Sequence, residues 1–162
     1  MFIRDVADAL EERGVGYAVV GGVAVNLHGI PRTTYDLDIV VDRTEPQLRA
    51  CREALESLGL RCRLPLTLES LAGESDEELR ARSLIAVTFT DPSDPLREVD
   101  VLVDVPIPAR ELVGRAQRLE SKELELRVVC LDDLIRLKRA AARPQDLADV
   151  AHLERLASRG RS

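Results

Sequence analysis

The pattern of apolar and polar positions along the 162 residues predicts an alternation of helices and strands. Segments with apolar residues three or four positions apart are predicted as helices, and segments of consecutive or alternating apolar residues as strands. The predicted helices are 2–13, 22–28, 45–58, 108–118, 131–142 and 145–158. The predicted strands are 16–21, 36–42, 84–90, 97–105 and 123–129. This order favours an α/β (α+β) fold in which helices flank a small mixed sheet.

Local signals set some of the element boundaries. Gly59 is expected to end the helix 45–58, because glycine readily adopts the conformation that follows a helix. Arg143-Pro144 separates the last two helices, since the residue before a proline avoids helical geometry and proline suits the first helical turn. Residues 64–82 show no clear period, and we interpret them as a mobile flap or an acidic surface loop.

Length and composition predict one domain over residues 1–162. A chain of this size buries about 70% of its unfolded surface, and 45% of its residues are hydrophobic. Within the domain we expect a motif-bearing core over 1–105. Residues 106–162 are expected to be mostly helical and to pack on the sheet.

A glycine pair and an aspartate pair are the main candidates for chemistry. Gly21 and Gly22 end the apolar run of the first strand, and glycines let backbone N–H groups approach a phosphate closely. Asp36 and Asp38 are two positions apart in Y-D-L-D-I-V-V, so both project from one face of a strand. Either signal alone is common in turns and exposed strand ends. Together they predict a site for a metal ion and a nucleotide.

A third carboxylate strengthens this prediction. The segment 97–105 alternates, with valines on one face. The other face carries Glu98, Asp100, Leu102 and Asp104. If this strand lies beside 36–42, Asp100 approaches the aspartate pair, and three carboxylates make an oxygen-rich site suited to Mg²⁺ or Mn²⁺. Glu98 is a lesser candidate ligand, and Asp104 is interpreted as a strand-end residue.

With these motifs the chain resembles the DNA polymerase β-like nucleotidyltransferase superfamily. It is most similar to the small bacterial members found in abortive-infection and toxin–antitoxin systems. The resemblance rests on G-G-V-A-V-N-L-H-G-I-P-R-T-T-Y-D-L-D-I-V-V (21–41) and E-V-D-V-L-V (98–103). Val23 follows the second glycine, where many relatives have a serine.

The resemblance implies specific roles for these residues. Gly21 and Gly22 would hold the triphosphate of a nucleoside triphosphate. Divalent metal, Mg²⁺ or Mn²⁺, would be bound by Asp36, Asp38 and Asp100, and Asp100 could also act as the base.

Two residues of the C-terminal helices are further candidates. Lys138 lies in the middle of the apolar face of 131–142, where its charge needs an anion. It either pairs with a core carboxylate or meets the triphosphate or its leaving pyrophosphate, as the resemblance implies. Asp146, in the motif R-P-x-D-x-x-D, either stabilises its helix start or bridges Lys138, or it orients Lys138 or the acceptor.

The segment P-R-T-T-Y-D leads into the aspartate pair and has two interpretations. It is either a turn in which Arg32 bridges carboxylates, or part of the nucleotide site. The resemblance places R-x-T beside the nucleotide. On that basis Arg32 is expected to orient Asp36 or contact phosphate, and Thr33 to join the nucleotide contacts.

Composition narrows the class of partner. The net charge of −6 and the 2% aromatic content provide neither a global basic surface for nucleic acid nor a series of rings for base stacking. The cysteines Cys51, Cys62 and Cys130 lack C-x-x-C spacing and are interpreted as reduced thiols. Neither a signal peptide nor a membrane-spanning run is recognised, so a cytoplasmic protein is expected.

We therefore predict a Mg²⁺-dependent nucleotidyltransferase that acts as the toxin of a toxin–antitoxin pair and has a cognate antitoxin. The acceptor is a tRNA 3′ end, a protein side chain or a small molecule, and the sequence leaves these open. The alternative is a non-catalytic nucleotide-binding or antitoxin-like module of the same fold. Three converging carboxylates favour catalysis, because a non-catalytic copy has no need of them.

Overall fold

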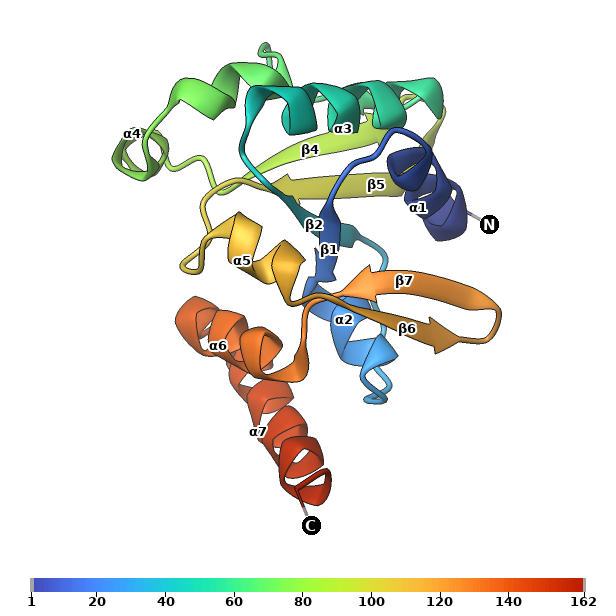
Figure 1. Cartoon of the computed structure of the whole chain (residues 1–162), viewed down its shortest axis with the longest axis vertical. Helices are drawn as coiled ribbons and strands as arrows, with labels where there is room; N and C mark the ends of the chain where they lie inside the picture. Colours follow the sequence, from blue (N-terminus) through green and yellow to red (C-terminus); the bar gives the residue numbers. More distant parts are fainter. Residues whose placement is uncertain (1, 162) are drawn as a thin grey trace.

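A mixed sheet of seven strands organises residues 2–161, which the computed structural model describes (Figure 1). The strand order is β3-β4-β5-β2-β1-β7-β6. The bounds are β1 Tyr17–Val20, β2 Leu37–Val41, β3 Arg61–Cys62, β4 Ala86–Asp91, β5 Asp94–Leu102, β6 Gln117–Ser121 and β7 Leu124–Val128. β1 is antiparallel to β2 and parallel to β7, whereas β2 is parallel to β5. The expected mixed α/β sheet is therefore confirmed.

Helices surround this sheet in two groups. Their bounds are α1 Phe2–Glu12, α2 Gly21–Leu27, α3 Glu45–Ser57, α4 Asp76–Ala81, α5 Ala109–Gly114, α6 Leu131–Ala141 and α7 Pro144–Arg159, with a 3₁₀ helix, η1, at Leu68–Gly73. α1 and α3 pack against each other near one end of the molecule (Figure 1). α6 and α7 pack together at the other end, where α6 contacts α2. None of the helices in residues 2–161 is long and apolar enough to cross a membrane.

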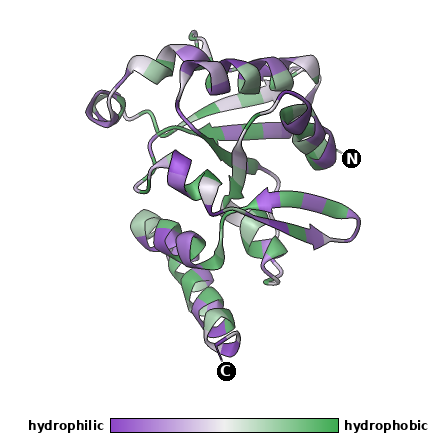
Figure 2. Ribbon diagram, viewed as in Figure 1, coloured by the Kyte–Doolittle hydropathy of each residue, from purple (hydrophilic) through white to green (hydrophobic). Residues whose placement is uncertain are grey.

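The core lies between the central strands and the apolar faces of α1 and α3. Each of the four residues of β1 is buried, and Figure 2 shows strong hydrophobic colour at the centre of the sheet. The inward stripe of α3 contains Leu48, Cys51 and Leu55, spaced as an amphipathic helix requires. Burial raises the pKa of the Cys51 thiol to about 12, so this cysteine is an inert core residue.

The boundary signals near residues 59 and 143 are confirmed. Gly59, at φ +85°, follows the end of α3 at Ser57. Ala142, at φ +52°, ends α6, and Pro144 occupies the first turn of α7. The short connection keeps α6 and α7 in contact.

The interpretation of 64–82 as a loop is wrong, because this stretch contains η1 and α4. α4 begins with a capping box in which Ser75 and Glu78 satisfy each other's backbone N–H groups. Leu68, Leu71 and Leu79 are fully buried. The segment is therefore a folded part of the core.

The predicted helix 108–118 is also wrong at its C-terminal end. α5 ends at Gly114, and Gln117–Ser121 forms β6, the edge strand paired with β7. The turn of this hairpin, Lys122-Glu123, has φ +48° and +67°. Such turns usually contain Asn or Gly, so the sequence lacked the usual signal. The two-residue strand β3 was likewise not predicted.

Candidate active site

Four acidic side chains meet where β2 and β5 lie side by side. The two strands are parallel neighbours, and Asp38 is directly opposite Asp100. Asp36 and Glu98 each lie two residues before one of this pair, so strand alternation brings them to the same side. The predicted adjacency of these two strands is therefore confirmed.

Three of the acids are close enough to share a metal ion. One ligand oxygen from each of Asp36, Glu98 and Asp100 lies within 4.8 Å of the other two. Carboxylate oxygens are the ligands that Mg²⁺ and Mn²⁺ prefer, so this set fits such an ion. Glu98, the lesser candidate in the sequence, belongs to the set. Asp38 lies beside it, and its role as a ligand stays a prediction.

Asp38 lies between this acidic cluster and the glycine pair. A Cβ at Gly21, which has φ +66°, would be 2.1 Å from Oδ2 of Asp38. Only glycine leaves room for the carboxylate there. Burial, followed by the charges of Asp100 and Asp36, raises the pKa of Asp38 to about 7. A cation among these acids would favour their ionised forms.

Gly22 has a packing requirement of its own. A Cβ at this position would be 2.8 Å from Oγ1 of Thr34 and 3.4 Å from Cζ of Arg32. The glycine pair therefore lets the chain that leads into β2 pack directly on the start of α2. Its contact with a triphosphate stays a prediction.

Thr88 of β4 contacts Asp100 from the side opposite Asp38. The two residues are directly opposite each other on neighbouring antiparallel strands. The Thr88 hydroxyl donates a hydrogen bond of 2.5 Å to Oδ1 of Asp100. Asp100 is therefore held between two strands of the sheet.

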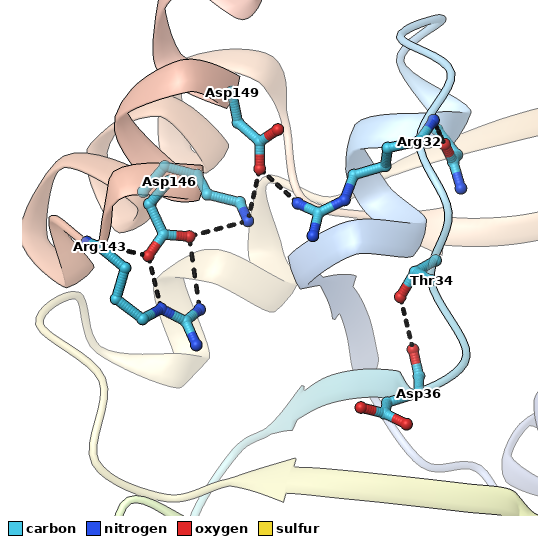
Figure 3. Close-up of polar contacts among 8 residues, drawn as sticks. Arg32, Thr34, Asp36, Arg143, Asp146 and Asp149 are labelled. Atoms are coloured by element: carbon cyan, nitrogen blue, oxygen red, sulfur yellow. Dashed lines mark hydrogen bonds and ion pairs between the residues drawn. The ribbon is translucent and has the colours of Figure 1, made fainter.

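A network of buried ion pairs joins α6 to α7 beside the acids (Figure 3). Lys138, only 6% exposed, lies 3.1 Å from both Asp146 and Asp149. Arg143 Nε donates to Asp146 at 2.7 Å. Burial opposes ionisation, but hydrogen bonds from Arg143 and Lys138 hold the pKa of Asp146 below its usual value. The expected pairing of Lys138 with a core carboxylate is therefore present, and its contact with a triphosphate stays a prediction.

Arg32 joins the same network from the segment after α2. It forms an ion pair with Asp149 (Figure 3). Its backbone N–H donates to the side chain of Asn26 at 2.7 Å. The expected contact with Asp36 is not made, since the guanidinium turns toward α7 instead. Thr33 is exposed in this segment, and contacts of either residue with a nucleotide stay predictions.

A cleft of about 590 Å³ connects the acids with α6. Asp38, Asp100 and Lys138 line it together with Gly21 and Arg143. Its apolar walls are formed by Ile85, Ala86, Leu102, Val105 and Pro106 on one side and by Leu134, Leu137, Ala140 and Ala141 on the other. The acidic and basic groups therefore face one hollow.

Sequence reasoning missed three residues of the site, Arg143, Asp149 and Thr88. Arg143 was interpreted only as part of the break between the last two helices. Asp149 is the second acid of R-P-x-D-x-x-D, and it lies at the edge of the apolar arc, as many exposed acids do. Its helical spacing from Asp146 was the available signal. No local sequence pattern pointed to Thr88, because its contact with Asp100 depends on the register between β4 and β5.

Comparisons with known proteins agree with this geometry. The family model described as the nucleotidyl transferase AbiEii toxin of Type IV toxin–antitoxin systems matches residues 7–161. A search of curated proteins found no match.

Several solved structures share the fold. The solution structure of the antibiotic-resistance factor ANT(2'')-Ia is 14% identical with a TM-score of 0.60, covering 99% of this chain and 83% of the other. The crystal structure of ANT(2'')-Ia in complex with adenylyl-2''-tobramycin is 14% identical, with a TM-score of 0.58 and coverage of 99% and 87%. A putative nucleotidyltransferase from Thermotoga maritima, TM1012, is 13% identical, with a TM-score of 0.56 and coverage of 97% and 91%.

At these identities the solved structures establish the fold alone. The family match covers nearly all of the sequence, including every residue of the acidic cluster and of the ion-pair network. The chain therefore belongs to the family of AbiEii nucleotidyl transferase toxins.

Proposed function

We propose that this chain is a divalent-metal-dependent nucleotidyltransferase. It would transfer a nucleotidyl group from a nucleoside triphosphate to an acceptor and act as the toxin of a toxin–antitoxin pair. The observation that carries this proposal is the convergence of Asp36, Glu98 and Asp100 at one point. Of these three acids, Asp100 also lines the cleft, as do Asp38 and Lys138. The chain belongs to a nucleotidyl transferase family.

The acids would hold the metal ion. Asp36, Glu98 and Asp100 are its proposed ligands, with Asp38 as a further ligand next to them. A bound Mg²⁺ or Mn²⁺ would polarise the α-phosphate and lower the pKa of the acceptor hydroxyl. Asp100 is our candidate for the base that takes the acceptor's proton.

Backbone and basic groups would hold the phosphates. The N–H groups at Gly21 and Gly22 lie at the start of α2, beside Asp38. Lys138 and Arg143 both line the same cleft. Both would stabilise the negative charge that develops on the leaving pyrophosphate.

The apolar walls of the cleft suit a nucleoside. A volume of about 590 Å³ falls within the usual range for pockets that bind small molecules, about 300–1,000 Å³. Aliphatic side chains of α6 and of the segments in and around β4 and β5 line the cleft, and a base can be held among them. We place the base and the sugar there, with the triphosphate toward the acids.

The acceptor is the open part of the proposal. One structural neighbour was solved in complex with adenylyl-2''-tobramycin, which supports a small molecule as one candidate acceptor. A tRNA 3′ end or a protein side chain is an equal candidate for this chain. The family description also leads us to expect a cognate antitoxin.

Incubation with each α-labelled nucleoside triphosphate, Mg²⁺ and a cell extract tests the proposal. Label on RNA, protein or a small molecule would support transfer and identify the acceptor class. A protein that binds a nucleotide but leaves all label unincorporated, with every triphosphate, would favour the non-catalytic alternative.

A further inference from the structure

Among the described residues, Asp100 is the acid of the cluster whose carboxylate accepts a hydrogen bond, whereas Glu98 has an ion pair with Arg63 at 3.5 Å. The Thr88 hydroxyl donates to Oδ1 of Asp100 at 2.5 Å, a length typical of a strong hydrogen bond to an ionised carboxylate. Both residues are half-buried and lie in strand interiors, directly opposite each other. The contact is therefore built from two ordered backbones.

This bond constrains how the Asp100 carboxylate can face a metal ion. The terminal torsion of an aspartate is broad, so an unassisted carboxylate samples a wide range of planes. The hydrogen bond from Thr88 to Oδ1 restricts this range. Within residues 2–161 nothing donates a hydrogen bond to Oδ2, which leaves that oxygen for a ligand.

The same strand offers an internal comparison. Thr90 lies two residues along β4, on the same face, opposite Glu98. Like Thr88 it is half-buried, but its hydroxyl makes no hydrogen bond within the described part of the chain. The two threonines therefore match in residue type and strand, and each is opposite an acid of the cluster. They differ in that only the Thr88 hydroxyl donates a hydrogen bond to its acid.

We propose that Thr88 is a positioning residue that orients the Asp100 carboxylate for metal binding. The inference rests on the metal site of the proposed function and adds a residue that acts through Asp100. Partners of this kind typically account for 10- to 100-fold in metal affinity. A merely structural threonine, by contrast, would contribute to strand packing, and its loss would lower stability without changing metal affinity.

Mn²⁺ affinity measured by calorimetry on the full chain separates these two roles. Thr88→Val keeps the branched shape and removes the hydroxyl, and we expect it to weaken Mn²⁺ binding about 10- to 100-fold. Thr88→Ser should restore affinity to within a few-fold of wild type. The control Thr90→Val should bind Mn²⁺ as the wild type does.

The outcomes distinguish failure of this role from failure of the metal site. Wild-type affinity in Thr88→Val, or an equal loss in Thr90→Val, would overturn the role of Thr88 while the metal site stands. Absence of Mn²⁺ binding by the wild-type chain would contradict the site itself and this role with it. If Thr88→Val folds poorly, Thr88→Ala is compared with Thr90→Ala under the same criteria.

Discussion

At the scale of single residues, Asp38 is the acid whose environment most strongly opposes ionisation. Burial and the charges of Asp100 and Asp36 raise its pKa to about 7 in the folded protein. The folded state therefore binds this proton more tightly than the unfolded state does. Without metal, the free energy of unfolding should fall as the pH rises from about 4 to about 7.

Asp38→Asn tests this assignment by urea unfolding of chelator-treated protein between pH 5 and pH 8. Between pH 5 and pH 8 the wild type should lose about 2–3 kcal/mol of unfolding free energy relative to the variant. In Asp38→Asn the unfolding free energy should still fall somewhat with rising pH, because burial and the charges of Asp100 and Asp36 also raise the pKa of Glu98. Asp42→Asn, which removes an acid that pairs with Arg110, should keep the wild-type slope. If the unfolding free energies of wild type and Asp38→Asn change with pH in parallel, the raised pKa of Asp38 is wrong.

Gly22 is the second residue for which we expect a clear effect of substitution, here on stability. Its missing Cβ leaves room for Thr34, whose Oγ1 and Cβ would otherwise lie at 2.8 and 2.9 Å. Gly22→Ala should therefore cost about 1–3 kcal/mol of stability by overpacking.

Thermal unfolding of Gly22→Ala, with Gly73→Ala as control, measures this effect. Gly73 has no atom within 4 Å of an added Cβ, so its substitution should be close to neutral. Thr34→Gly in the Gly22→Ala background should recover part of the loss. If the two alanine variants are equally stable, the packing account is wrong.

At the scale of elements, the buried ion pairs hold α6 against α7. Lys138 contacts Asp146 and Asp149 at 3.1 Å each, with both acids largely buried. Lys138→Met would leave two buried carboxylates without this partner. We expect a loss of about 3–5 kcal/mol in stability, together with at least a hundredfold lower transfer rate in the protein that remains folded.

Arg139→Met is the matched control for Lys138→Met. Arg139 also joins α6 to α7, through Glu154, but this pair is exposed, with side-chain accessibilities of 57% and 44%. Its removal should cost less than about 1 kcal/mol. Equal destabilisation of the two variants by urea unfolding would argue against the buried network. Normal activity in folded Lys138→Met would remove Lys138 from the catalytic site.

The sequence predicted those elements whose patterns are local. β1, β2 and β5 follow from their valine-rich runs, and α3 from its apolar stripe and the glycine after it. β6 was missed because an exposed edge strand needs few apolar residues and its turn lacks glycine. α4 was missed although Ser75 and Glu78 form a recognisable capping box. The helix has only six residues, too few to show a helical pattern of apolar positions.

The site was predictable as far as it depends on spacing along one strand. Asp36, Asp38 and Asp100 were found from alternation, and the structure confirms that their strands are neighbours. The contacts of Thr88 with Asp100 and of Arg32 with Asp149 depend on register and on helix docking. No local sequence pattern predicts these two contacts, so only the three-dimensional structure could reveal them.

At the scale of the whole molecule, the sheet and the C-terminal helices together create the cleft. β2 and β5 contribute the acids, whereas α6 contributes Lys138 and one apolar wall. The glycine pair at the start of α2 lies between them. Residues from the motif-bearing core and from the C-terminal part thus meet at one cleft.

The most direct test of nucleotidyl transfer is the Mg²⁺-dependent incorporation of α-label by wild type, Asp36→Asn/Asp100→Asn and Asp42→Asn. We predict incorporation by the wild type and by Asp42→Asn, abolished by a chelator. The double variant should fall at least a hundredfold, about 3 kcal/mol in transition-state stabilisation, while remaining folded. Incorporation by the double variant at the wild-type rate, or incorporation that is insensitive to the chelator, would contradict the metal-dependent mechanism.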